Sequence, residues 1–247
     1  MDFYKDFAEE YDAMHPRETV YEQQSFFAEL ISRYHITSCL DCACGAGWHL
    51  EMLHRMGLDC AGSDLSPDML ALAKKHLAST GIPLKCEDFR TLERSWKGHR
   101  FDMVVCLTTS LPHVTTAKGI ATALRAMRRR LNANGILVVS NGISDKLLDI
   151  KPVFIAGPTF EDRAVYFFNE YPETERAVFH VLIVSKTASG FRHVVRSMDY
   201  YAMRKDTLHG FLEQAEFRDM NYYGDFAFTR YSKRTSDRLI VVAQKPR

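Results

Sequence analysis

The sequence has 247 residues, of which 46% are hydrophobic and 26% are charged, and its formal net charge is +1. A chain of this length supplies one large domain with a buried core, and a near-neutral charge gives no general attraction for nucleic acid. No apolar run approaches the roughly 20 residues of a membrane-spanning helix, and the acidic, aromatic start MDFYKDFAEEYDAMH is unlike a secretory signal. We therefore expect a cytoplasmic protein that binds neither a membrane nor nucleic acid.

The first 150 residues alternate between short apolar segments and helical patterns. After a helical opening over residues 1–34, five segments are apolar enough to be buried strands: SCLDCA, LDCAGSD, PLKCED, FDMVVCL and GILVVSN. The helical patterns WHLEMLHRMG, SPDMLALAKKHLASTG and AKGIATALRAMRRRLNANG lie between them. This alternation predicts an α/β fold, a doubly wound Rossmann-like parallel sheet with helices on both faces.

The pattern changes after residue 150. AVYFFNE, RAVFHVLIVSKT and FRHVVRSMDYYAMR alternate and are rich in β-branched and aromatic residues, which predicts three antiparallel strands. KDTLHGFLEQAEF is helical again, and FRDMNYYGDF and DRLIVVAQK predict two strands that complete a sheet of seven. No repeat or linker divides the chain, so we expect a single domain over 1–247. Its parts are N-terminal helices (1–34), an α/β core (35–150), an antiparallel insertion (151–204), and a closing helix and strands (205–247).

The stretch DCACGAG falls where the first predicted strand gives way to a helix, a common ligand-binding position in open α/β sheets. Gly45 and Gly47 permit close backbone approach, and the next helix offers free N–H groups to a polar ligand. A dinucleotide fingerprint would need a third glycine where Leu50 stands. Asp41, just ahead of the loop, would repel a pyrophosphate but could attract a cation. The loop therefore does not predict a nicotinamide or flavin dinucleotide.

Six cysteines lie in the first half of the chain, mostly beside apolar residues, which indicates buried, reduced thiols. Cys39, Cys42 and Cys44 alternatively suggest zinc or an iron–sulfur cluster. A buried strand end cannot easily turn three thiolates to one ion, however, and no C-x-x-C or H-x-x-H pair follows. We predict no metal.

The pattern D-x-A-C-G-A-G resembles the nucleotide loop of class I S-adenosylmethionine-dependent methyltransferases, with Ala43 where glycine is more usual. The resemblance continues in order through GSDLSPDML, CEDF, FDMVVCLTTSLPHV and LNANGILVVS, over roughly residues 11–140. It implies S-adenosyl-L-methionine as the cofactor, with Asp64 accepting from both ribose hydroxyls and Asp88 and Phe89 at the adenine. An alternative for Asp64 is to cap the helix that begins near Ser66. The cofactor residues that the resemblance implies are Tyr11, Asp41, Ala43, Cys44, Gly45, Gly47, Asp64, Leu65, Met69, Asp88, Phe89, Leu107 and Thr108.

Methyl transfer from a sulfonium is an in-line displacement, so the protein mainly holds the acceptor and excludes water. The resemblance places CLTTSLPHV beside the methyl donor, which makes Thr109 and His113 candidate catalytic residues. A loop histidine bonded to backbone is the alternative for His113. The opening resembles Y-x-x-x-A-x-x-Y-D, in which Tyr11 lies on a helix that closes over the cofactor and is a third candidate. A core aromatic is the alternative for Tyr11.

Within this family the layout resembles glycine N-methyltransferase and amino-sugar N-methyltransferases. Thr109 replaces an asparagine, and Gly142 replaces the arginine that grips the substrate carboxylate. Glycine is therefore not the expected acceptor unless another basic residue, Arg163 or Arg192, supplies the charge. The insertion is expected to cover the pocket, although alternation does not tell which of its faces looks down. Its candidates are Tyr166, Phe168, His180, His193, Tyr200 and Tyr201.

The function that follows is transfer of a methyl group to a small molecule, with nitrogen as the preferred acceptor atom. Oxygen, sulfur or carbon acceptors on the same fold are alternatives, as is a protein that binds the cofactor without catalysis. The sequence does not decide between a monomer and a homo-oligomer.

Overall fold

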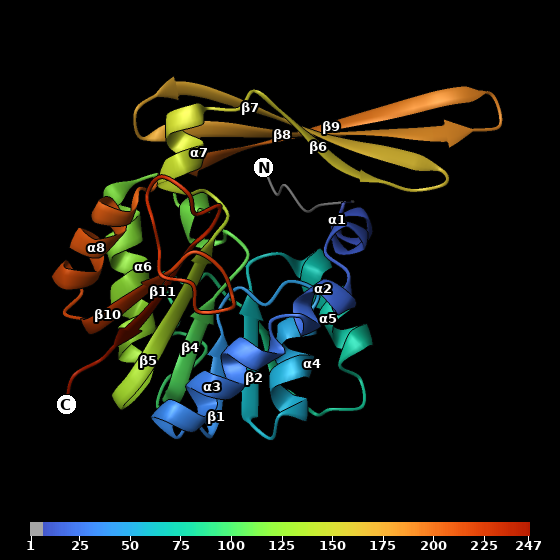
Figure 1. Ribbon diagram of the computed structural model, residues 1–247. Coiled ribbons are helices and arrows are strands. Elements are labelled where there is room, and N and C mark those ends of the chain that lie inside the picture. Colours follow the sequence, from blue (N-terminus) through green and yellow to red (C-terminus); the bar gives the residue numbers. More distant parts are fainter. Residues whose placement is uncertain (1–6) are drawn as a thin grey trace.

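The computed structural model describes residues 7–247, which are built around a seven-stranded mixed sheet of order β10-β11-β5-β4-β1-β2-β3 (Figure 1). Strands β1 to β5 are parallel, while β11 is antiparallel to β5 and β10 is antiparallel to β11. The bounds are β1 Ser38–Asp41, β2 Asp59–Asp64, β3 Leu84–Cys86, β4 Phe101–Cys106, β5 Leu131–Asn141, β10 Arg218–Tyr223 and β11 Leu239–Gln244. The predicted doubly wound α/β sheet is confirmed.

Helices cover both faces of this sheet, which explains why its strands are apolar on both sides. In β4, Met103 and Val105 belong to one buried cluster and Val104 and Cys106 to another. The first cluster includes residues of α3 Gln24–Tyr34, α4 Trp48–Arg55 and α5 Pro67–His76, and the second includes residues of α6 Ala117–Arg129 and α8 Lys205–Gln214. Continuous apolar strands are expected where both faces are buried.

The strand order reverses between β1 and β4, which lie side by side. In open α/β sheets the crevice beyond the carboxyl ends of two such strands is the usual ligand site. The loop after β1 leads into α4, and the loop after β4 leads into a short 3-10 helix, Leu111–His113. Sequence and topology therefore place the loops after β1 and β4 at one point.

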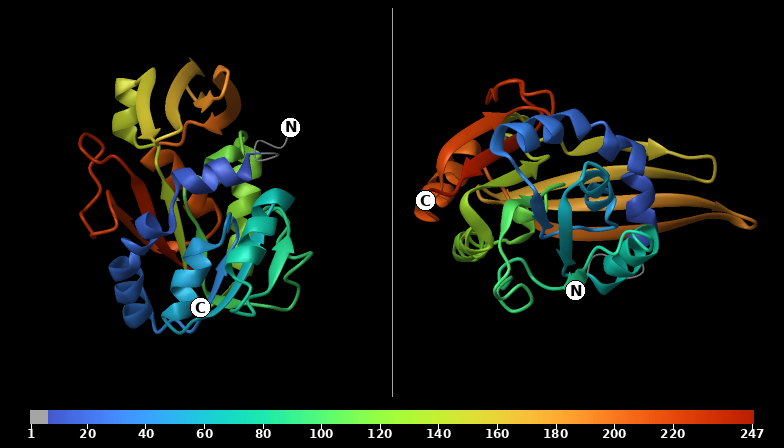
Figure 2. Two further views of the ribbon diagram at one scale, coloured as in Figure 1. Left: turned by 90° about the vertical axis from the view of Figure 1, so that its right-hand side faces the viewer. Right: turned by 90° about the horizontal axis from the view of Figure 1, so that it is seen from below.

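A second sheet of four antiparallel strands forms a separate layer beyond the carboxyl ends of the main strands (Figure 1; Figure 2, left). Its strands are β6 Phe154–Thr159, β7 Arg163–Glu173, β8 Arg176–Thr187 and β9 Gly190–Tyr201. The antiparallel insertion is confirmed, but the prediction of three strands was wrong because β6 was missed. Its sequence FIAGPT contains Gly157 and Pro158, which disfavour strands, and it persists because it lies at the sheet edge with a register shift between Ala156 and Thr159.

Three smaller helices connect the layers. They are α1 Ala8–Met14, α2 Arg17–Tyr21 and α7 Asp145–Ile150, and α1 lies below the second sheet in Figure 1. Tyr4, the first tyrosine of the Y-x-x-x-A-x-x-Y-D pattern, lies outside the described residues. Within residues 7–247, no helix has the length and apolar character needed to cross a membrane.

Candidate active site

The loop between β1 and α4 is held in a shape that only its glycines adopt without strain. Gly45 and Gly47 have φ angles of 53° and 89°, in the left-handed region. A Cβ on Gly47 would also lie 2.9 Å from Leu77 Cδ1. The amide of Ala43 donates to Asp41 Oδ1 at 3.1 Å, and the amide of Gly45 donates to Asp64 Oδ2 at 2.8 Å. Two carboxylates therefore fix the loop before any ligand binds.

Asp64 ends β2 and connects this loop to the next helix. Its Oδ1 accepts from the amide of Ser66 at 2.9 Å, while the Ser66 hydroxyl caps α5 by accepting from the amide of Met69. Pro67 follows at the first position of this helix. A carboxylate oxygen can accept more than one hydrogen bond, so these two backbone contacts are compatible with a ligand at Asp64.

Asp41 lies behind the loop and is only 1% exposed. Burial raises the pKa of Asp41 to about 7, the Ala43 amide opposes this rise, and the nearby Asp64 carboxylate adds to it. The structure thus places this predicted cofactor residue beneath the loop and outside the three cavities described next.

Three adjoining cavities surround the loops after β1 and β4. The loop cavity, of about 70 Å³, is bordered by Cys44, Gly45, Gly47 and Met69. The edge cavity, of about 580 Å³, includes Leu65, Asp88, Phe89 and His113 among its lining residues. The roofed cavity, of about 260 Å³, lies beneath the second sheet. Shared residues join them: Ala43, Asp64 and Ser110 line the loop and edge cavities, and Tyr11, His15 and Thr108 line the loop and roofed cavities.

The edge cavity combines an exposed apolar side chain with a paired carboxylate. Leu65 is 65% exposed there, although leucine is normally packed. Asp88 accepts from Arg90 Nε at 2.9 and 3.0 Å. Burial raises the pKa of Asp88, but hydrogen bonds from the Arg90 side chain and backbone outweigh it and hold that pKa below its usual value. Asp88 is therefore ionised at neutral pH.

His113 lies in the edge cavity, with its ring 4.7 Å from that of Tyr200 on β9. Burial lowers the pKa of His113 to about 4, so the imidazole is neutral at pH 7. It does not line the roofed cavity. Leu107, the other residue predicted on this strand end, is buried in the core and lines none of the three cavities.

The turn after β4 is strained. Thr108 and Thr109 have φ angles of 55° and 67°, a region that costs β-branched residues on the order of 1–3 kcal/mol each. The end of β5 holds them there: Ser140 accepts from both amides at 3.0 Å, through its hydroxyl for Thr108 and its carbonyl for Thr109. Thr109 Oγ1 in turn accepts from the Gly142 amide at 2.9 Å. These hydrogen bonds hold both threonines at the cavity wall in spite of the backbone strain.

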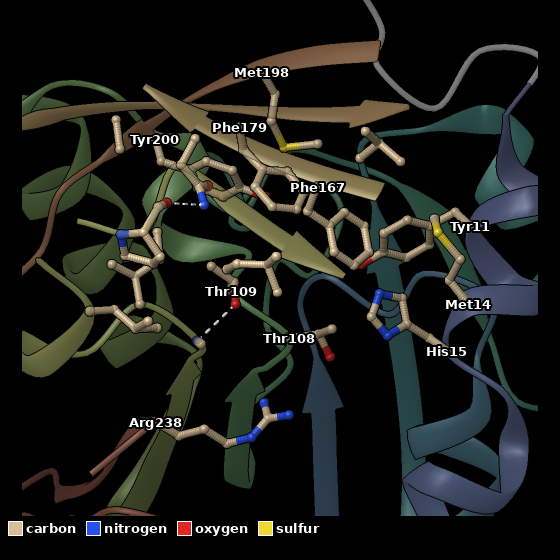
Figure 3. A pocket seen from close by; sticks show the side chains of 18 of the residues that line it. Tyr11, Met14, His15, Thr108, Thr109, Phe167, Phe179, Met198, Tyr200 and Arg238 are labelled. Atoms are coloured by element: carbon tan, nitrogen blue, oxygen red, sulfur yellow. Dashed lines mark hydrogen bonds between the residues drawn. The ribbon is translucent and has the colours of Figure 1, made fainter. Parts of the chain in front are cut away.

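The roofed cavity is covered by alternate residues of the second sheet. Figure 3 shows Phe167, Phe179, Met198 and Tyr200 on one side, facing Thr108 and Thr109. Of the residues predicted to cover the pocket, only Tyr200 lines this cavity. Burial raises the pKa of Tyr200, so its phenol stays protonated.

The other insertion candidates lie elsewhere. Phe168 packs against Phe154, and His180 contacts Ser197 on the opposite face of the sheet. Arg163 pairs with Asp162, and neither Arg163 nor Arg192 lines the cavity.

Two residues that the sequence did not single out line the roofed cavity. His15 follows α1, with its ring 4.6 Å from that of Tyr11, and Arg238 precedes β11 and reaches in from the wall opposite the roof (Figure 3). Desolvation by the surrounding protein is the larger cause of the lowered pKa of His15, and the positive charge of Arg238 is the smaller one. No motif marks either residue, because they become neighbours only through the tertiary fold.

The helix α1 is fastened above the loop cavity by a small polar cluster. Trp48 Nε1 donates to Asp12 Oδ1 at 2.8 Å, and the indole stacks on His76 at 3.9 Å. Tyr11 is thus held at the boundary between the loop and roofed cavities.

The cysteines are free thiols. Five are buried, but Cys86 is exposed at the end of the edge strand β3, which corrects the expectation for that residue. Among the described residues, no cluster of three or more His, Cys, Asp or Glu side chains could hold a metal ion.

Fold and site together define a nucleotide-binding protein of the doubly wound α/β type. A family model described as a methyltransferase domain matches residues 39–135. The chain is 25% identical to the glycine/sarcosine N-methyltransferase of Aphanothece halophytica, over 99% of this chain and 90% of the relative. It is 26% identical to the glycine/sarcosine/dimethylglycine N-methyltransferase of Actinopolyspora halophila over 97% of this chain, but spans only 41% of that relative.

One similar solved structure is the S-adenosylmethionine-bound amino pentose methyltransferase of Micromonospora echinaspora. Its TM-score is 0.74 at 20% identity, over 95% of this chain and 96% of that one, which shows a shared fold. The chain is an S-adenosylmethionine-dependent methyltransferase, and the resemblance inferred from its motifs is confirmed.

The residues present fit this cofactor. A Cβ on Gly45 would lie 3.4 Å from Met69 Cε, a fellow lining residue of the loop cavity, so glycine leaves space there. The exposed Leu65 offers an apolar surface beside the ionised Asp88, as an adenine ring requires.

Proposed function

We propose that the enzyme methylates the nitrogen of a small-molecule amine that binds in the roofed cavity, while the cofactor lies along the loop and edge cavities. In this proposal Asp64 accepts from the ribose hydroxyls, Asp88 accepts from the adenine amino group, and Leu65 and Phe89 contact the ring. The remainder of the cofactor is surrounded by Ala43, Cys44, Gly45, Gly47 and Met69. Leu107 and Asp41 support the loops from behind. The parts of the domain then act as a lid (1–34), a cofactor-binding core (35–150), a cover over the acceptor (151–204) and a closing unit (205–247).

The observation that carries this proposal is the shared wall formed by Tyr11, His15 and Thr108, which line both the loop and the roofed cavity. The bound cofactor supplies a methyl group on a positively charged sulfur. Groups that line both cavities are the ones able to hold an acceptor atom in line with that carbon and to exclude water.

An amine must be neutral to attack, so the wall needs a group that can take a proton. His15 is suited to this task because its lowered pKa keeps the imidazole neutral at pH 7. Thr109 Oγ1 accepts a hydrogen bond from the Gly142 amide. The hydroxyl hydrogen of Thr109 is therefore available to donate to a substrate atom in the roofed cavity. His113 faces the edge cavity, so we propose that it positions the cofactor and that His15 is the imidazole beside the amine.

The N-methyltransferase names of the two relatives support nitrogen as the acceptor atom. The cofactor and the free thiols, five of them buried, support work in the reducing cytoplasm on a small molecule. The net charge of +1 gives no general attraction for nucleic acid, which supports a small-molecule acceptor.

The test is transfer of labelled methyl groups from the cofactor to matched amines, phenols and thiols built on the same carbon skeletons. Label on the amines would support the proposal. Label on oxygen or sulfur would contradict the choice of nitrogen, and cofactor binding without any transfer would favour a non-catalytic protein. His15→Gln should lower kcat most near neutral pH, where the imidazole is neutral while the amine still carries a proton. His54→Gln, at the end of α4, serves as the matched histidine control.

A further inference from the structure

The walls of the roofed cavity differ in character, and this difference describes the acceptor. We propose, on the basis of the function proposed above, that the amine is carried on an apolar, ring-sized body and that an anionic oxygen group of the same molecule, a carboxylate or a phosphate, binds Arg238.

The apolar part of the argument rests on the roof. Phe167 and Phe179 stack at 5.2 Å, and Tyr200 meets Phe179 edge-on at 5.9 Å. Ile143, Leu147 and Ile155 extend the same surface. At ~30 Å³ for a water-sized group, 260 Å³ holds roughly eight or more heavy atoms. Glycine, with its five heavy atoms and no apolar body, would leave this surface against water.

The charge of the lining gives the second part. Arg238 is the one permanently charged side chain among the described residues that line the cavity, and no aspartate or glutamate lines it. Lys146 pairs with the neighbouring Asp237, but Arg238 has no hydrogen bond or ion pair within residues 7–247. Arg238 is exposed and borders the apolar lining of the cavity, and a carboxylate or phosphate matches its fork of N–H donors in charge and shape.

This charge distribution also suits the chemistry at the amine. Among residues 7–247 no carboxylate lines the cavity to stabilise a protonated amine, so this lining favours the neutral, nucleophilic form. Desolvation and, after it, the positive charge of Arg238 lower the pKa of His15. Arg238 would thus orient the acceptor through its anionic group.

The test compares matched probes. Phenylalanine and phenethylamine share the ring and the amine, but only the first has a carboxylate, and O-phosphotyramine carries a phosphate instead. The wild-type enzyme should prefer the anionic probes by kcat/KM, and glycine should be poor. The preferred anion distinguishes carboxylate from phosphate. Arg238→Gln should reduce the preference for the anionic probe over phenethylamine about 10- to 100-fold, mainly through KM, because two charge-assisted bonds are lost. Arg238→Lys should recover part of it.

A binding measurement keeps the inference testable without turnover. Calorimetry with 3-phenylpropanoate, which has the ring and the anion but no amine, should show binding to the wild type in the presence of S-adenosylhomocysteine and its loss in Arg238→Gln. Arg192→Gln, an exposed arginine of β9 outside the cavity, is the matched control. An unchanged preference and unchanged binding in Arg238→Gln would overturn the inference while leaving amine methylation intact. Failure to methylate any amine, with anion binding retained, would instead count against the proposed function.

Discussion

Replacement of Asp64 tests the cofactor site most sharply, because one carboxylate serves both the loop and the ligand. Asp64→Ala removes the acceptors of the Gly45 and Ser66 amides. Water can reach the half-buried site, so the free energy of unfolding should fall by only about 1–3 kcal/mol, or roughly 2–10 °C in Tm for a chain of this size. Loss of two charge-assisted bonds to the ribose, each worth about 1.5–3 kcal/mol, should weaken cofactor binding on the order of a hundredfold or more.

Calorimetry with S-adenosylmethionine and thermal unfolding of the free protein measure the two effects separately. Asp64→Asn keeps the shape and one oxygen but loses the charge, so its stability should lie nearer the wild type while its affinity still falls strongly. Asp59→Asn, at the exposed start of the same strand, is the matched control and should change neither quantity. An Asp64→Asn or Asp64→Ala protein that melts early yet binds the cofactor with normal affinity would show that this carboxylate only holds the loop.

Three further outcomes are expected. Burial lowers the pKa of His49 and of His113 from 6.5 to about 4. Between these two pH values the unfolded state binds more protons than the folded state. The free energy of unfolding should therefore be highest above pH 6.5 and fall as the pH drops toward 4, by roughly 3 kcal/mol for each residue. Melting curves across this range check it, and His49→Gln should flatten the slope; a slope unchanged by that substitution would refute the assignment. Gly47→Ala should lower Tm by several degrees, because its φ of 89° and the contact with Leu77 both oppose a Cβ, whereas Gly57→Ala at a similar φ in open space should cost less; equal losses would show that the contact is unimportant. Metal analysis should find no stoichiometric zinc or iron, and chelators should leave Tm unchanged; a stoichiometric metal would contradict the interpretation of Cys39, Cys42 and Cys44 as packing residues.

The main sheet could be predicted from the sequence because its determinants are local. Each parallel strand is a short apolar run, and each following helix has its own periodicity and start signal, as at Ser66 and Pro67. The glycine positions and acidic strand ends of the loop region could be identified for the same reason. Strand β6 could not be predicted in this way, because Gly157 and Pro158 disfavour a strand. They are tolerated since β6 is an edge strand that pairs only with β7.

Most residues that line the roofed cavity could not be predicted from the sequence, because they become neighbours only in the tertiary structure. The twofold alternation of β7 defines two faces, but only its docking shows that Phe167, and not Phe168, looks down. His15 and Arg238 are separated by more than two hundred positions in the chain and meet only in the folded protein. The resemblance to relatives directed attention to Arg163 and Arg192, whereas the arginine at the cavity comes from the segment before β11.

The second sheet consists of one uninterrupted stretch, residues 154–201, while the described residues that line the loop cavity all lie between residues 11 and 110. Changes in the downward-facing positions of β7, β8 and β9 can therefore alter the ceiling of the roofed cavity without disturbing the glycine loop or Asp64. Because of this division, substitutions within one contiguous segment can change which amine is accepted, while the loop next to Asp64 stays the same. The division also makes this stretch the natural unit to exchange between related enzymes when a different amine is to be methylated.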